Sequence, residues 1–266
     1  MALRRFERYV ALGDSTTEGF GDPDGAGGYR GWANRLAERI AAHQGSLAYA
    51  NLGVRGQCAR QIRETQLAPA LALRPELATV GAGMNDLLRP GFEARAVGAD
   101  IDAMQRALIA QGSVVLTFTL PDISRRLAVG PLAQVLSRRT LALDDEIRRV
   151  SAATGTIVLE VAAHPNAADP RMWSRDRLHA NPEGHARIAA GLARLLGLPG
   201  TDDAWLEPLP PLPPPGLRAR IAEDLAWGRD HLAPWLWRRM RGRSSGDHGT
   251  AKLPSLTAVP PPPVAR

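Results

Sequence analysis

The chain has 266 residues, of which 44% are hydrophobic, a size and composition suited to one α/β domain of roughly 200 residues with an appendage. Its formal net charge is +6, but residues 216–266 alone hold nine Lys or Arg and four Asp or Glu, so residues 1–215 are nearly neutral. No segment approaches the roughly 20 apolar residues of a transmembrane helix, and a neutral body argues against nucleic acid as a partner.

The N-terminus and the cysteine content favour a cytoplasmic protein. Residues 1–8 lack the apolar run and small-residue cleavage site of a secretory signal peptide. The single cysteine, Cys58, excludes an internal disulfide, and we expect a small buried or half-buried thiol there rather than a nucleophile.

Between residue 8 and about residue 198, apolar β-like runs alternate with longer helical patterns. The apolar runs predict strands at Tyr9–Leu12, Leu47–Leu52, Leu77–Gly81, Val114–Leu120 and Thr156–Val161. Helices are predicted at about 30–43, 59–73, 93–111 and 131–153, with a last helix after Pro182. Strands that alternate with helices predict a mostly parallel five-stranded sheet that helices cover on both faces.

Glycine-rich polar segments follow the first three of these strands. They are Gly13-Asp14-Ser15, Gly53–Gly56 and Gly81–Asp86. In an open parallel sheet, ligands bind beyond the carboxyl ends of the strands, on the loops that leave them. We therefore expect the chemistry of this protein at that edge of the sheet.

Ser15 is the candidate nucleophile, because a serine after a strand in a glycine-assisted turn can expose its hydroxyl. Such a serine needs a base, a carboxylate that orients the base, and donors for an oxyanion. His179 and Asp176, three residues apart before the last helix, offer the base and the carboxylate. Asn85 offers a side-chain amide, and the backbone N–H groups of Ser15 and Gly56 offer the remaining donors.

Four short blocks, in this order, resemble those of the SGNH (GDSL-like) hydrolases. They are Gly13-Asp14-Ser15-Thr16, Asn51-Leu52-Gly53-Val54-Arg55-Gly56, Gly83-Met84-Asn85-Asp86 and Asp176-Arg177-Leu178-His179. The resemblance spans roughly residues 8–198. Thr16 stands where the best-known form of the first block has leucine, a difference that bears on substrate preference rather than on the reaction.

The resemblance implies a flavodoxin-like three-layer α/β/α sandwich and an ester hydrolase that works without metal or cofactor. Ser15, Asp176 and His179 match the catalytic triad of the family, and Ser15, Gly56 and Asn85 match its oxyanion hole. Ser15 would attack with His179 as base, and water would then release the acyl group from the enzyme.

Neighbouring residues have simpler interpretations. Asp14 and Asp86 are expected to stabilise turns, and His185, inside the last helix, is expected to be a packed or surface histidine. Tyr29 and Trp32 are candidates for an acyl pocket. Met172 and Trp173 are equally expected in that pocket or in the core.

Beyond a domain of residues 1–200, the chain changes character. The composition of residues 201–216 predicts a proline-rich linker. Residues 217–243 are predicted to form a basic, tryptophan-containing helix that Pro234 interrupts, and residues 244–266 are predicted to be a disordered tail. The helix at 217–243 has the composition of one that lies on an anionic membrane. Packing against its own domain or a partner subunit is the preferred interpretation.

The sequence thus predicts a serine hydrolase of small carboxylic esters, either a short-chain acyl esterase or a sugar O-deacetylase. A lysophospholipase or thioesterase at a membrane surface stays an alternative, as does a non-catalytic scaffold of the same fold. Nucleotide binding is disfavoured, because no Gly-x-Gly-x-x-Gly follows the first strand.

Overall fold

A six-stranded sheet forms the centre of the computed structural model, which describes residues 4–127, 130–213, 216–241 and 249–259. Its strands are β1 (Arg8–Gly13), β2 (Leu47–Asn51), β3 (Leu77–Gly81), β4 (Val114–Phe118), β5 (Ile157–Leu159) and β6 (Leu253–Val259). The spatial order is β5-β4-β3-β1-β2-β6, and β1 to β5 are parallel. The predicted α/β sandwich is confirmed, with one strand more than the sequence predicted.

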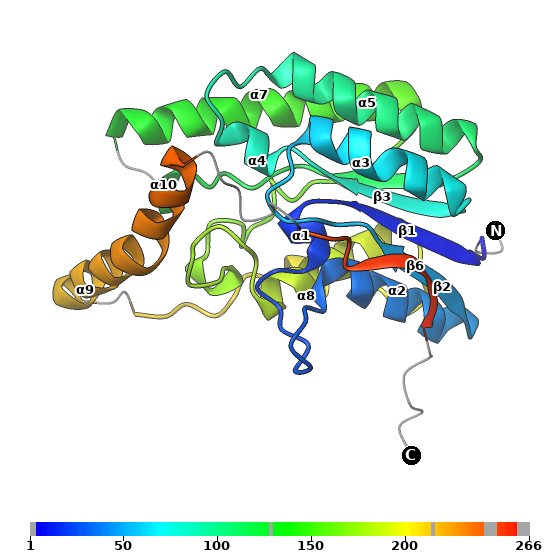
Figure 1. The fold of residues 1–266 in the computed structure, drawn as a ribbon. Coiled ribbons are helices and arrows are strands. Elements are labelled where there is room, and N and C mark those ends of the chain that lie inside the picture. The colour runs from blue at the N-terminus through cyan, green and yellow to red at the C-terminus, as the bar shows by residue number, and fades with distance from the viewer. Residues whose placement is uncertain (1–3, 128–129, 214–215, 242–248, 260–266) are drawn as a thin grey trace.

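Helices cover both faces of the sheet (Figure 1). The longer ones are α2 (Gly31–Gln44), α3 (Ala59–Ala72), α5 (Ala94–Ala110), α7 (Gly130–Thr154) and α8 (Pro182–Leu195). Helices α3, α5 and α7 lie on one face, and α2 and α8 pack together on the other. Helix α8 begins as its sequence predicts, because the Asn181 side chain accepts the Gly184 N–H and Pro182 occupies the first turn.

Strand β6 corrects the prediction of a disordered tail at 244–266. Residues 253–259 pair antiparallel with β2, and Leu253, Leu256 and Val259 pack partly against the core. The register shifts between Tyr49 and Asn51, so the edge strand bulges where Pro254 enters it. A proline fits an edge strand because its missing N–H is not needed by a second neighbour. The rest of the predicted tail, apart from 249–252, lies outside the described residues.

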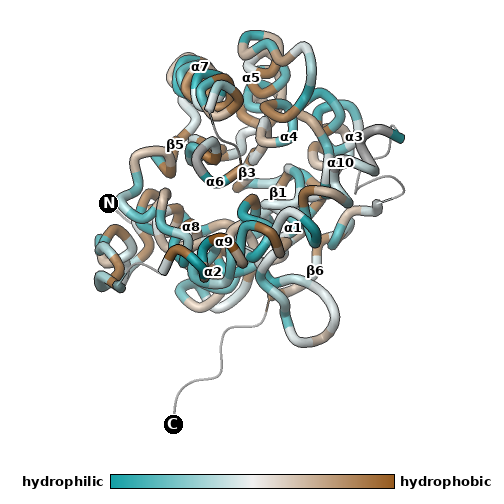
Figure 2. The backbone as a smooth tube through the Cα atoms, turned by 90° about the vertical axis from the view of Figure 1, so that its left-hand side faces the viewer, coloured by the Kyte–Doolittle hydropathy of each residue, from teal (hydrophilic) through white to brown (hydrophobic). Residues whose placement is uncertain are grey.

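Residues 217–240, between the domain and β6, are helical as predicted, with a break. Helix α9 (Leu217–Trp227) continues into a π-helical turn, η3 (Gly228–Leu232), and then α10 (Ala233–Met240). The π turn ends at Leu232, two residues before Pro234, whose ring nitrogen has no N–H for an α-helical bond. Both helices lie on the side where β1 ends (Figure 1 and Figure 2). No helix among the described residues is long and apolar enough to cross a membrane.

The described part of the predicted linker, residues 201–213, lies on the surface of the domain. Within it, η2 (Ala204–Leu206) carries Trp205 against the His164 ring, with 5.1 Å between the ring centroids. The Asn166 side chain bonds to the backbone of Glu207 and of Leu209 over 2.8 and 3.1 Å. These contacts attach the start of the C-terminal segment to the loop that follows β5.

Candidate active site

Ser15 is the first residue of α1 (Ser15–Glu18), a single helical turn directly after β1. Asp14 caps this turn, because its Oδ1 accepts the Thr16 N–H over 2.9 Å. The turn ends at Gly19, whose φ of +96° is a conformation that favours glycine, and a side chain there would collide with the backbone of Gly31. This tight crossing fixes where α1, and with it Ser15, sits at the carboxyl end of the strand.

A chain of two hydrogen bonds joins Ser15 to the loop before α8. The Ser15 Oγ and His179 Nε2 atoms are 2.8 Å apart, and His179 Nδ1 is 2.6 Å from Asp176 Oδ2. Because Nδ1 faces a carboxylate, it carries the proton, so Nε2 can accept the serine hydroxyl proton. The structure therefore brings the three predicted triad residues together in the order hydroxyl, imidazole, carboxylate.

The Asp176 carboxylate also holds its own loop together. Its Oδ1 accepts the backbone N–H groups of Leu178 and His179, each over 3.0 Å. Burial on its own raises the pKa of Asp176, but the bonds to His179 and to these backbone groups outweigh it and lower the pKa overall. The carboxylate is thus held in its charged form, which keeps the imidazole tautomer fixed.

Asn85 lies beside the nucleophile, on α4 (Met84–Leu87) after β3. Its Nδ2 atom donates to Asp14 Oδ2 and to the Gln57 carbonyl, both over 3.0 Å. Burial is the main cause that raises the pKa of Asp14, which is 2% exposed, while bonds from Thr16 and Asn85 oppose it. Asp14 stabilises the turn, as predicted, and also orients the Asn85 amide, which the sequence did not indicate.

The loop after β2 brings Gly56 to the same edge of the sheet. The Asn51 side chain bonds to the Thr17 carbonyl over 2.8 Å and accepts the Gly53 N–H over 2.9 Å, which ties this loop to α1. Gly56 has a φ of +79°, a left-handed conformation that favours glycine in the turn. The second predicted block is thus joined through a buried amide to α1, the turn that carries Ser15.

An aromatic and charged wall stands next to His179. The Phe20 ring lies 4.6 Å from the His179 ring and 5.0 Å from the Tyr29 ring, centroid to centroid. The Arg55 guanidinium covers both aromatic rings at 4.9 and 5.4 Å and pairs with Glu18. Of these four side chains, the sequence indicated only Tyr29, because Phe20, Arg55 and Glu18 meet through the fold.

Other residues considered for the pocket belong to the packing of the domain. Trp32 is fully buried and meets Phe118 edge to face, so the expectation that it lines an acyl pocket is wrong. Met172 is buried, and Trp173 stacks under the Arg126 guanidinium at 3.6 Å. Cys58 is half-buried and caps α3, and burial raises the pKa of its thiol.

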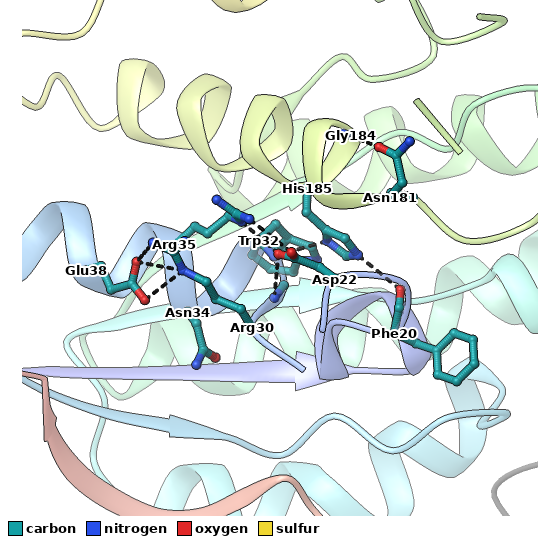
Figure 3. Close-up of polar contacts among 12 residues, drawn as sticks. Phe20, Asp22, Arg30, Trp32, Asn34, Arg35, Glu38, Asn181, Gly184 and His185 are labelled. Carbon is teal, nitrogen blue, oxygen red and sulfur yellow. Dashed lines mark hydrogen bonds and ion pairs between the residues drawn. The ribbon is translucent and has the colours of Figure 1, made fainter. Parts of the chain in front are cut away.

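His185 belongs to a buried network rather than to the triad (Figure 3). Its Nδ1 accepts the backbone N–H of Trp32 and its Nε2 faces the Phe20 carbonyl, both over 3.1 Å. Beside it, the Asp22 carboxylate is held by the Arg35 guanidinium over 2.7 and 3.0 Å. The network fixes the Phe20–Asp22 segment, and burial lowers the pKa of His185 to about 4.

Two buried contacts at the site have no signal in the sequence. The Gln66 side chain, from α3, bonds to both the N–H and the carbonyl of Gly13 over 2.8 Å, and so holds the turn before Ser15. Asp86, in contrast, accepts the Ala59 N–H over 3.0 Å, the structural role expected for it. Across the described ranges, no group of three His, Cys, Asp or Glu side chains has the arrangement of a metal site.

Comparisons with known proteins agree with this geometry. Residues 11–187 match the model of the GDSL-like Lipase/Acylhydrolase family. An acetylxylan esterase from Geobacillus stearothermophilus has a similar structure (TM-score 0.59, 16% identity, 74% of this chain and 97% of that chain). A lipase/acylhydrolase from Enterococcus faecalis is also similar (TM-score 0.58, 21% identity, 72% of this chain and 96% of that chain).

At these identities the likeness to the solved structures shows the fold, and no curated protein sequence matches the chain. The match to the family model is more specific than the structural likeness, because it covers most of the chain and includes all four sequence blocks. The chain therefore belongs to the GDSL-like lipase/acylhydrolase family and is an ester-hydrolysing enzyme of the SGNH type.

Proposed function

We propose that the enzyme cleaves short-chain carboxylic esters through an acyl intermediate on Ser15. The observation that carries the proposal is the continuous hydrogen-bond chain from the Ser15 hydroxyl through His179 to Asp176, with heavy-atom distances of 2.8 and 2.6 Å. Serine is a weak nucleophile on its own, and this arrangement supplies the base that activates it.

The reaction proceeds in two steps. Ser15 Oγ bonds to the ester carbonyl carbon while its proton passes to His179 Nε2, and the proton then moves to the departing alcohol as the ester C–O bond breaks. Water then attacks the carbonyl carbon of the acyl-Ser15 ester and gives a proton to His179 Nε2. This proton passes to Ser15 Oγ as the bond between Oγ and the acyl group breaks, so the carboxylic acid leaves and the serine hydroxyl is restored. Asp176 stays ionised throughout and stabilises the imidazolium that forms between the proton transfers.

The oxyanion would be bound by the N–H groups of Ser15 and Gly56 and by the Asn85 amide. Ser15 lies in the first turn of α1, where a backbone N–H has no acceptor within the helix. The two amide protons of Asn85 face Asp14 and Gln57 in this structure. Donation to an oxyanion therefore requires that Asn85 share one of these protons with the substrate oxygen.

A short acyl group, such as the acetyl group of an esterified sugar, fits the surroundings of the site best. The wall of Phe20, Tyr29 and the paired Arg55 stands against the His179 ring, and Ser15 itself is only 7% exposed. The likeness to an acetylxylan esterase points to the same class, an O-deacetylase. Aromatic rings beside the base would also give a sugar ring an apolar surface.

The proposal is tested by hydrolysis of p-nitrophenyl esters from acetate to palmitate. We expect the highest kcat/KM for acetate or butyrate, and no turnover above background for Ser15→Ala. A fluorophosphonate probe should label the wild type and leave Ser15→Ala unlabelled. A wild type that neither hydrolyses an ester nor takes the label would instead be a scaffold of this fold.

A second candidate, hydrolysis of lipid esters at a membrane surface, is favoured by one observation. Leu217, Ile221 and Leu225 form a stripe on α9 and are 71%, 50% and 71% exposed. Flotation with vesicles that contain anionic lipid tests this candidate, with Leu217→Ser/Leu225→Ser as the matched variant. Flotation of the wild type alone, together with preference for a long acyl chain, would replace the short-chain proposal.

A further inference from the structure

Helix α9 touches the loop that carries the acid and base of the triad. The indole N–H of Trp227 donates to the backbone carbonyl of Asp176 over 3.0 Å. Next to it, Arg177 Nη2 lies 2.6 Å from Asp224 Oδ1, and the Arg177 guanidinium stacks on the Trp227 ring at 4.9 Å. The C-terminal extension therefore reaches the two residues at the head of the Asp-x-x-His block.

The loop itself is a tight turn with one strained residue. It is closed by bonds from Ser174 N to the His179 carbonyl (2.8 Å) and from Arg177 N to the Ser174 carbonyl (2.9 Å). Arg177 has a φ of +63°, a left-handed conformation that costs free energy for a residue with a side chain. Such a conformation persists where surrounding contacts hold it, and the Arg177 side chain is held by Trp227 and Asp224.

Helix α9 contacts the domain at the Asp176–Arg177 loop through Trp227 and Asp224. The remaining residues of α9 are exposed, and Trp227 is its one partly buried residue. Leu217 and Leu225 point their apolar side chains into solvent, so burial of those side chains in the domain core does not hold α9 in place. Trp227 and Asp224 thus supply specific polar contacts from α9 to the domain, and these contacts end at Asp176 and Arg177.

We propose that Trp227 is a positioning residue of the active site: by bonding to the Asp176 carbonyl and supporting Arg177, it holds Asp176 against His179. The inference rests on the proposed function and deepens it, because it makes the C-terminal extension part of the catalytic apparatus. Trp227 touches no reacting atom. Its bond to the Asp176 backbone positions the Asp176 carboxylate, and that carboxylate in turn orients the His179 imidazole.

The kinetic test compares two substitutions of tryptophan on the same extension. Trp227→Phe keeps a ring for Arg177 to stack on and removes the N–H donor, whereas Trp237→Phe alters an exposed residue outside the catalytic loop. We expect Trp227→Phe to lower kcat on p-nitrophenyl acetate by about 10-fold or more with little change in KM, because a misplacement of 1 Å can cost on the order of 100-fold. Trp237→Phe should match the wild type, and circular dichroism should show that both variants are folded.

A double-variant cycle tests the strain on Arg177. Glycine adopts a positive φ without penalty. In an Arg177→Gly background, contacts from Trp227 and Asp224 to a side chain at position 177 are therefore not required to keep the loop in this conformation. Trp227→Phe should then lower kcat by a smaller factor than it does in the wild type. Equal factors in the two backgrounds would overturn the part of the proposal that concerns Arg177.

A spectroscopic measurement separates this inference from the proposed function. The His179 Nδ1 proton, in its short bond to Asp176, should give a far-downfield proton resonance that His179→Gln removes. Trp227→Phe should shift or broaden this resonance and Trp237→Phe should leave it in place, whether or not any ester is hydrolysed. A wild-type kcat and an unchanged resonance in Trp227→Phe, or a change in KM alone, would overturn the inference.

Discussion

The side-chain amide of Asn85 donates to the buried carboxylate of Asp14, 3.0 Å away, so the residue before the nucleophile orients the group proposed to bind the oxyanion. The two oxygens of Asp14 have separate partners. Oδ1 caps α1 through the Thr16 N–H, and Oδ2 accepts from Asn85. Helix capping and amide orientation are therefore functions of one carboxylate, and substitutions can separate them.

Asp14→Asn and Asp14→Ala should differ in stability and resemble each other in activity. Asparagine still caps a helix, but its NH2 group would face the NH2 group of Asn85, so we expect a kcat about 10-fold lower at nearly unchanged stability. Alanine loses both bonds and should also lose about 1 kcal/mol of unfolding free energy. Ester turnover and urea unfolding measure the two effects. Wild-type kcat in Asp14→Asn would show that the carboxylate does not orient Asn85.

Asn85→Ala should lower kcat by on the order of 10²–10³ with a small effect on KM, because an oxyanion donor acts mainly in the transition state. Asp86→Asn is the matched control on the same helical turn. Asp86 accepts the Ala59 N–H in the first turn of α3, so its substitution should change stability more than turnover. Comparable losses of kcat in the two variants would mean that disruption of the loop, rather than loss of a donor, explains the result.

The sequence predicted much of the site because the decisive contacts follow from the topology. Parallel strands end at one edge, so the loops that carry Ser15, Gly56 and Asn85 had to meet there once the strands were correctly placed. Asp176 and His179 are three residues apart, a spacing that lets them bond within one loop. Each of these inferences required only local pattern and fold class.

The contacts that sequence analysis missed depend on segments distant in the chain. The Trp227 bond to Asp176 depends on where α9 docks, and no periodicity encodes that position. Strand β6 was missed for a different reason. Its partly buried residues, Leu253, Leu256 and Val259, recur every third position because of the bulge, so the alternation typical of a strand is absent.

His185 should make the stability of the protein depend on pH. Burial lowers its pKa from the usual 6.5 to about 4, so between these values the unfolded chain binds a proton that the folded protein does not. The stabilisation from the neutral ring is present above pH 6.5 and is lost as the pH falls toward 4, a loss of about 3 kcal/mol. Nearby, Asp22 opposes the shift and Arg35 adds to it.

Urea unfolding of the wild type and His185→Gln at several values between pH 7.5 and pH 4 checks this expectation. Glutamine offers a donor and an acceptor but does not titrate, and the other titratable groups are common to both proteins. The difference in unfolding free energy should therefore shrink by about 3 kcal/mol on acidification. A constant difference would show that His185 titrates normally in the folded protein.

Removal of β6 should expose the edge of β2. A chain that ends at Gly249 loses the antiparallel partner of β2 and the Lys252 bonds to the Arg30 carbonyl and to Asn34, over 2.9 and 3.0 Å. We expect a lower Tm and concentration-dependent association in size-exclusion chromatography, since an unpaired strand edge recruits other chains. A chain that ends at Val259 keeps β6 and serves as the control. Monodisperse behaviour of both truncations would contradict this role of β6.

The pairing of Asn51 with Leu253 also bears on the order in which the sheet folds. Most of the chain separates the two residues, so the β2–β6 ladder is a contact of high sequence separation, and the entropy of closing so large a loop places it late in folding. The five parallel strands must therefore assemble while the outer side of β2 has no hydrogen-bonded partner. During refolding at high protein concentration, docking of β6 from the same chain competes with intermolecular pairing of β2 to another molecule.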